Sequence, residues 1–142
     1  HAQVILLDTN VVSELMKPAP AAAAARWIAE QPATTLYTSS ITQAEVLHGI
    51  LLLPAGRRRS TLEAAAEAMF DEDFGGRVLP FGGEAARAYA QIAAQRRRSG
   101  RSISHFDAQI AAIARSARAS VATRNVGDYE ECGITIVNPW DA

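Results

Sequence analysis

The chain has 142 residues, of which 49% are hydrophobic, so it suits one packed domain with a single core and does not have the composition of a disordered protein. No apolar run approaches the roughly 20 residues that span a bilayer, so we expect no membrane segment. The formal net charge of −1 is unevenly distributed. Arginines cluster at 57–59 and 96–98, and acidic residues cluster at 71–73. Arginine clusters can bind phosphates, although a solvated helix end explains each cluster equally well.

In chain order, the first half alternates short apolar runs with helical segments that end near proline or glycine. The apolar run before Asp8 has the pattern of a strand that is buried on both faces. Pro18, Pro32 and Pro54 mark the ends of successive helices. We predict strands at 4–7 and 36–39, and helices at 9–16, 21–30, 42–53 and 57–70.

The second half continues the alternation. Residues 78–81 are predicted to form a short strand or an edge segment, because Pro80 cannot donate a hydrogen bond to a neighbouring strand. A strongly amphipathic helix is predicted at 84–98 and is capped by Gly100. The next helix, 104–118, should bury Phe106, Ile110, Ile113, Ala114 and Ala117. Strands at 120–123 and 134–137 complete the chain. We find no internal repeat or second-domain boundary, so residues 1–142 are predicted to form one domain.

Strands that alternate with helices predict an α/β fold with a central, mostly parallel sheet of four to five strands flanked by helices. In such sheets, ligands bind beyond the carboxyl ends of the strands. Asp8 follows the first strand, Ser39 ends the second, and Arg124 and Asn125 follow the fourth. The polar residues of the chain should therefore gather at one edge of the sheet.

Three carboxylates lie where helices are predicted to begin, and each has a simple structural explanation. Asp8 fits an N-cap, whose side chain accepts hydrogen bonds from the first helical N–H groups. Thr42 and Glu45 have the spacing of a capping box, and Ser104 and Asp107 have the same spacing. Taken singly, each acid is weak evidence for function.

Together, Asp8, Glu45 and Asp107 predict more than helix capping, because all three helices start near one sheet edge. Carboxylates crowded into one cleft repel each other, so a cation is expected to neutralise them. Mg²⁺ or Mn²⁺ suits this role, since both prefer oxygen ligands. The three histidines and the single cysteine are too sparse for a zinc site. Cys132 alone cannot form an internal disulfide, which favours the reducing cytoplasm.

The motifs resemble those of PIN-domain nucleases. Residues 4–11 (VILLDTNV) are similar to the first motif of that family, 42–45 (TQAE) to the second, 107–112 (DAQIAA) to the third and 122–125 (ATRN) to the fourth. The order and spacing match from 4 to 140. The similarity is greatest to VapC-type toxins of bacterial toxin–antitoxin modules, including a subgroup that ends in Asn-Pro-Trp, as at 138–140.

The resemblance implies a PIN-like domain that hydrolyses RNA phosphodiester bonds with Mg²⁺ or Mn²⁺. Asp8 and Asp107 would be the principal metal ligands, and Glu45 would complete the acidic pocket, directly or through water, and position or deprotonate the attacking water. Many family members carry an aspartate where this chain has Asn125. Asn125 could bind through its amide oxygen or a water, or Asp128 could supply the missing charge. Whether one or two metal ions bind stays open.

The resemblance also implies partners: an RNA substrate, a cognate antitoxin that covers the cleft, and a second copy of the chain in a homodimer. Arg124 is the best candidate to hold RNA, with Thr9 and Thr42 as further polar contacts. The residues also leave two other functions open. A Mg²⁺-dependent phosphoryl-transfer domain would need a lysine at a later strand end, but Lys17 is the only lysine. A non-catalytic binding module would use the carboxylates only as helix caps.

Overall fold

A five-stranded parallel sheet forms the centre of the computed structural model, which describes residues 3–142. Residues 1 and 2 of the predicted domain lie outside this described part. The strand order is β3-β2-β1-β4-β5, and every neighbouring pair is parallel. This confirms the predicted α/β fold and its mostly parallel sheet. The strands are β1 (Ile5–Leu7), β2 (Leu36–Ser39), β3 (Val78–Leu79), β4 (Ser120–Ala122) and β5 (Ile136–Val137).

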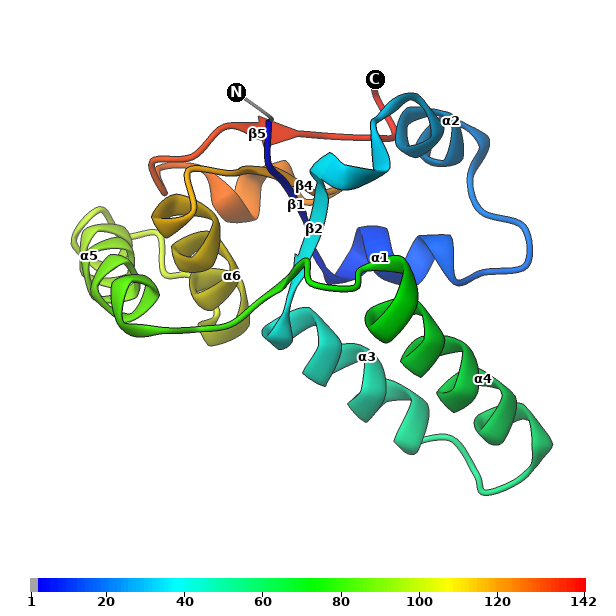
Figure 1. Ribbon diagram of the computed structural model, residues 1–142. Coiled ribbons are helices and arrows are strands. Elements are labelled where there is room, and N and C mark those ends of the chain that lie inside the picture. Colours follow the sequence, from blue (N-terminus) through cyan, green and yellow to red (C-terminus); the bar gives the residue numbers. More distant parts are fainter. Residues whose placement is uncertain (1–2) are drawn as a thin grey trace.

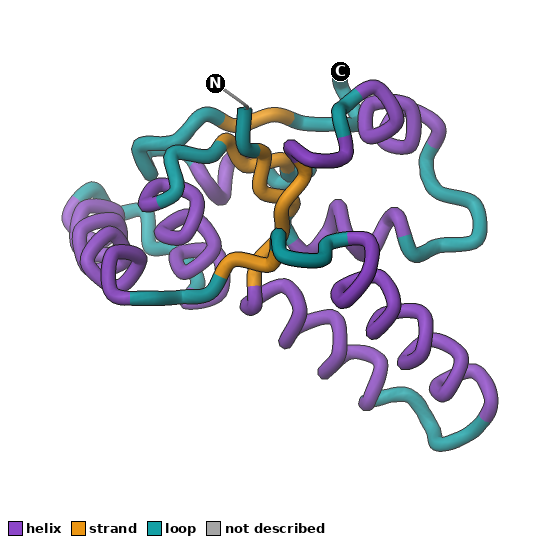
Figure 2. Tube along the Cα trace, viewed as in Figure 1, coloured by secondary structure: helices purple, strands orange, loops and turns teal. Residues whose placement is uncertain are grey.

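Helices cover both faces of the sheet (Figures 1 and 2). Helices α5 and α6 lie on one side, and α1 to α4 lie on the other, with the α3–α4 pair extending away from the sheet (Figure 1). Three short helical turns, η1 (Ala33–Thr35), η2 (Met69–Asp73) and η3 (Val126–Tyr129), complete the connections. The helices are α1 (Thr9–Leu15), α2 (Ala22–Glu30), α3 (Ser40–Leu51), α4 (Arg57–Ala68), α5 (Gly83–Arg98) and α6 (His105–Ser116).

The core consists of two hydrophobic clusters. Because successive strand residues point to opposite faces, Leu6 packs with Ile92 and Ile110 in one cluster, while Ile5 and Leu7 belong to the other. Burying apolar surface contributes roughly 25 cal/mol per Å², so this two-sided burial holds β1 firmly at the centre of the sheet. The end of β1 is therefore a rigid place from which to present a functional side chain.

Several boundaries differ from the predicted ones. Helix α3 begins at Ser40, earlier than predicted, because Ser39 is its N-cap and accepts a hydrogen bond from the Thr42 N–H at 3.1 Å. Helix α4 ends at Ala68 and continues as the wider turn η2. The prediction that Phe106 faces inward is wrong, since 52% of it is exposed. Ala117 is also exposed, because α6 has already ended at Ser116.

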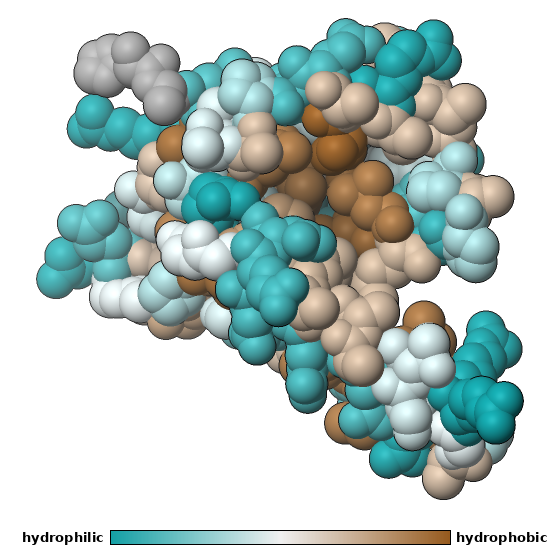
Figure 3. Space-filling view, turned by 45° about the vertical axis from the view of Figure 1, so that its right-hand side comes forward, coloured by the Kyte–Doolittle hydropathy of each residue, from teal (hydrophilic) through white to brown (hydrophobic). Residues whose placement is uncertain are grey.

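The surface also shows the separation between the α3–α4 pair and the rest of the domain. Figure 3 shows the α3–α4 pair standing out from the body, and a hollow with hydrophobic side chains in the middle of this face. Leu51 and Leu52, at the end of α3, are 50% and 72% exposed. No helix within residues 3–142 combines the length and apolar character that a membrane crossing needs.

Candidate active site

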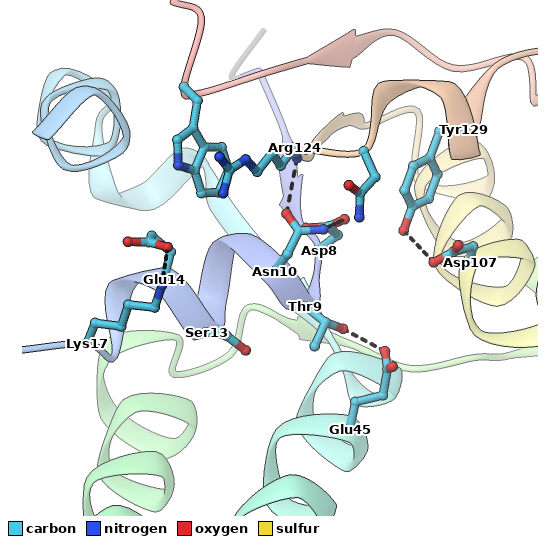
Figure 4. Close-up of a pocket in the computed structure, with 12 residues that line it drawn as sticks. Asp8, Thr9, Asn10, Ser13, Glu14, Lys17, Glu45, Asp107, Arg124 and Tyr129 are labelled. Atoms are coloured by element: carbon cyan, nitrogen blue, oxygen red, sulfur yellow. Dashed lines mark hydrogen bonds and ion pairs between the residues drawn. The ribbon is translucent and has the colours of Figure 1, made fainter. Parts of the chain in front are cut away.

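A cleft of about 500 Å³ opens where β1 and β4 end at the carboxyl edge of the sheet (Figure 4). The three predicted carboxylates all line it, although they come from separate parts of the chain: Asp8 from the end of β1, Glu45 from α3 and Asp107 from α6. This confirms the prediction, made from the topology of the sheet, that the three carboxylates lie at the same place. The lining residues are Asp8, Thr9, Asn10, Ser13, Glu14, Lys17, Glu45, Asp107, Arg124, Asn125, Tyr129 and Trp140.

Asp8 is the most buried of the three, with 2% of its surface exposed. It is the N-cap of α1, as predicted, and accepts a hydrogen bond from the Val11 N–H at 3.2 Å. Its other oxygen accepts from Asn10 Nδ2 at 2.9 Å. Burial raises the pKa of Asp8 to about 6, and repulsion from Asp107 adds to this effect. The capping and functional interpretations of Asp8 are therefore compatible.

Glu45 projects from α3 toward the start of α1. The Thr9 hydroxyl donates to Glu45 Oε1 at 2.6 Å, and Thr9 Oγ1 lies 3.1 Å from Thr42 Oγ1. The predicted capping box is wrong, because Ser39, not Thr42, caps α3. Glu45 therefore does not cap its own helix. The alternative interpretation, in which Glu45 is only a helix-capping carboxylate, loses its main support.

Asp107 lies in the first turn of α6. Its backbone N–H donates to Ser104 Oγ at 3.1 Å, so Ser104 is the predicted N-cap. The carboxylate instead accepts a hydrogen bond from the Tyr129 hydroxyl, with 3.3 Å between Oδ1 and the phenol oxygen. Burial, followed by repulsion from Asp128, raises the pKa of Asp107 above its usual value.

The two aspartates suit a hard divalent cation. Both have pKa values raised chiefly by burial; repulsion from Asp107 adds to the shift of Asp8, and repulsion from Asp128 adds to that of Asp107. A cation would offset this repulsion, and carboxylate oxygens are the ligands that Mg²⁺ and Mn²⁺ prefer. Within residues 3–142, however, no group of three or more His, Cys, Asp or Glu side chains is placed to hold a metal ion. The three acids thus line one cleft without forming a compact three-residue group among the described residues.

The remaining predicted residues separate into those in the cleft and those outside it. Arg124 lies in the cleft and its guanidinium carbon is 5.1 Å from the ring centre of Trp140. Asn125 also lines the cleft, whereas Asp128 is exposed and lies outside the lining. Thr42 is fully buried, so it supports the cleft from behind and offers no surface to RNA.

The sequence analysis missed six lining residues as parts of the site: Asn10, Ser13, Glu14, Lys17, Tyr129 and Trp140. Asn10 and Trp140 had signals, since both belong to motifs quoted there, but neither was given a role. Glu14 and Tyr129 had none. Asn10 donates to Asp8 and accepts from the Arg124 backbone N–H at 3.1 Å, which ties the ends of β1 and β4 together. Glu14 is buried and pairs with Lys17 Nζ at 2.9 Å, which holds the pKa of Glu14 below its usual value.

The sequence and the fold both match a known protein family. The PIN domain family model matches residues 5–127. The VapC ribonuclease Y4jK of Sinorhizobium fredii is 44% identical over 97% of this chain and 99% of its own length. The toxin FitB of Neisseria gonorrhoeae is 36% identical over 96% and 99%. The crystal structure of FitAcB from Neisseria gonorrhoeae superposes with a TM-score of 0.92 and 36% identity, covering 98% of this chain and 100% of that one.

The chain therefore belongs to the PIN domain family. Its full-length relatives place it among the VapC-type toxins of that family. The resemblance seen in the sequence motifs is thereby confirmed.

Proposed function

We propose that this chain is a metal-dependent endoribonuclease that acts as the toxin of a toxin–antitoxin pair. The observation that carries this proposal is the arrival of three carboxylates from three separate elements in one open cleft, with the pKa of Asp8 raised to about 6. A shifted pKa in a cleft is typical of functional groups. The relatives named above include a ribonuclease and a toxin, which supports the same activity.

Asp8 and Asp107 would hold the metal ion. They are neighbouring acids with raised pKa values, so a nearby cation would stabilise the ionised form of both carboxylates. A bound Mg²⁺ or Mn²⁺ would lower the pKa of a water molecule and offset charge on the phosphate. Glu45, whose Oε1 accepts a hydrogen bond from Thr9, would accept a proton from the attacking water. Asn125 contributes a neutral amide to the cleft, so we propose Asn125 rather than Asp128 as the fourth polar group.

The RNA substrate would enter at the end of the cleft opposite the carboxylates. This end carries the positive charge of the cleft. Arg124 stacks against Trp140, so its guanidinium is positioned without an ion pair to any acid in residues 3–142. A guanidinium that packs on an aromatic ring and forms no direct ion pair suits the RNA phosphate backbone. Thr9 lines the same cleft, but its hydroxyl is engaged with Glu45, so we assign it to positioning Glu45.

The partners follow from the toxin assignment. A cognate antitoxin would cover the cleft, and a basic side chain placed among the carboxylates would neutralise them in the absence of metal. We also propose a homodimer and a cytoplasmic location, because RNA and a protein antitoxin would be met there.

The test is incubation of the purified chain with total RNA, with Mg²⁺ or Mn²⁺ against a chelator, followed by mapping of the cut ends. We expect chelator-sensitive cleavage, which the substitution Asp8→Asn lowers by about two orders of magnitude or more, given that even residues behind metal ligands contribute 10–100-fold. Asp71→Asn is the matched control, since Asp71 is an exposed acid in η2, outside the cleft. Equal cleavage by Asp8→Asn and the wild type would overturn the metal assignment.

A further inference from the structure

Tyr129 is a buried phenol at the wall of the acidic cleft. It belongs to η3, the turn that follows β4, and only 1% of it is exposed. Its hydroxyl nevertheless lines the cleft and donates to Asp107 Oδ1 at 3.3 Å (Figure 4). A buried hydroxyl without a partner is costly, so this hydrogen bond fixes both the phenol and the carboxylate that receives it.

The phenol is the donor in this contact, because an ionised carboxylate oxygen can only accept a hydrogen bond. Burial raises the pKa of Tyr129 well above its usual range, and the negative charges of Asp8 and Asp107 raise it further. A neutral donor orients an acid without cancelling its charge, in contrast to a lysine or arginine, which would compete with a metal ion.

A second buried side chain holds the segment that carries Tyr129. Arg96, in the last turn of α5, is 4% exposed, and its Nη1 donates to the carbonyls of Asp128 at 3.1 Å and Glu130 at 2.7 Å. These carbonyls flank Tyr129 on both sides. The Nε of Arg96 donates to the Arg101 carbonyl at 2.6 Å. Arg96 is thus used to fix backbone, and no acid in residues 3–142 forms an ion pair with it.

We infer that Tyr129 is a positioning residue for the cleft: it holds Asp107 by one oxygen and presents the carboxylate to the metal ion. Arg96 fixes the turn from which Tyr129 reaches Asp107. The inference rests on the proposed function, since it assumes that Asp107 is a metal ligand. Groups that hydrogen-bond to metal ligands commonly contribute 10–100-fold to metal affinity or activity.

The experiment is a calorimetric titration of the full chain with Mn²⁺, together with RNA cleavage at saturating Mn²⁺. Tyr129→Phe removes only the hydroxyl, and we expect it to weaken Mn²⁺ binding about tenfold or more. KM for RNA should stay within twofold, because Tyr129 contacts the acid rather than the substrate. Tyr89→Phe is the matched control: Tyr89 Oη lies 2.8 Å from His105 Nδ1, so it also loses one hydrogen bond near the start of α6, but outside the cleft.

Equal Mn²⁺ affinity in Tyr129→Phe and the wild type would overturn the inference, as would equal weakening in both tyrosine variants. Absence of Mn²⁺ binding by the wild type would also overturn it. The proposed ribonuclease activity is decided separately, by whether the wild type cuts RNA. Circular dichroism of each variant establishes that a change in affinity does not come from unfolding.

Discussion

The two walls of the cleft are built in different ways. The first wall, Asp8 to Asn10, is one continuous segment: Asp8 caps the helix that follows it and receives its second hydrogen bond from a residue two positions away. The second wall, Asp107 with Tyr129, joins a helix start to a turn that lies after the next strand. The first wall follows from local chain geometry, whereas the second depends on how α5, α6 and η3 pack.

This difference also affects the charges. Asp8 is almost completely buried and caps its own helix, whereas Asp107 is half-buried and accepts a hydrogen bond from a phenol 22 positions away. Both pKa values are raised, chiefly by burial. Mutations should therefore disturb the second wall through packing and the first wall through charge.

The largest effect is expected from Arg96→Met, which tests the packing of the second wall. It leaves the carbonyls of Arg101, Asp128 and Glu130 without their buried donor, so we expect the free energy of unfolding to fall by about 4 kcal/mol. The measurement is urea unfolding. Arg97→Met is the matched control, because Arg97 is its exposed neighbour in the same helix. If both variants lose the same stability, Arg96 does not hold the turn.

Asp8→Asn tests the first wall through charge. The folded chain holds a proton on Asp8 more tightly than the unfolded chain does, because burial raises the pKa of Asp8 from 3.8 to about 6. Ionised Asp8 therefore costs stability as the pH rises from about 4 to 6, and the full cost remains above pH 6. Asparagine can still cap α1, so at pH 7.5 in chelator the variant should be more stable by up to about 3 kcal/mol.

The measurement is the melting temperature of Asp8→Asn and the wild type between pH 4 and 8. The difference should vanish near pH 4. Asp107→Asn should shift stability in the same direction by less, since Asp107 is half-buried. A variant that is stabilised equally at pH 4 and pH 7.5 would contradict a role for the charge.

The sequence was sufficient for the sheet, the helices and the shared position of the three acids, because hydrophobic periodicity and parallel topology determine where strands end. The capping of α3 was misassigned because Ser39 and Thr42 both suit an N-cap, and only the exact end of β2 decides between them. Tyr129 could not be found at all. Its role depends on a contact between residues 22 positions apart, for which no local pattern exists.

A smaller effect is expected at the junction between the first wall and α3. Thr9→Val keeps the shape of the side chain but removes the donor to Glu45 and the contact with Thr42 Oγ1. We expect a loss of about 1 kcal/mol in unfolding free energy and a several-fold fall in kcat, with KM for RNA unchanged. Thr9→Ser retains the hydroxyl and should retain activity. If the valine variant cleaves RNA as the wild type does, Glu45 needs no donor from α1.

The smallest effect is expected from Asp128→Asn, which decides the fourth position of the cleft. Asp128 is exposed and lies outside the lining, and it acts on Asp107 only through repulsion. Its removal should slightly lower the pKa of Asp107 and leave cleavage within about twofold, as for an ordinary surface substitution. Asn125→Asp, in contrast, adds a charge inside the cleft and should tighten Mn²⁺ binding. Titration of both variants with Mn²⁺ distinguishes the two candidates for the fourth position. A large loss of Mn²⁺ affinity in Asp128→Asn would assign that position to Asp128 instead of Asn125. The second wall would then contain a second acid in addition to Asp107 and the phenol.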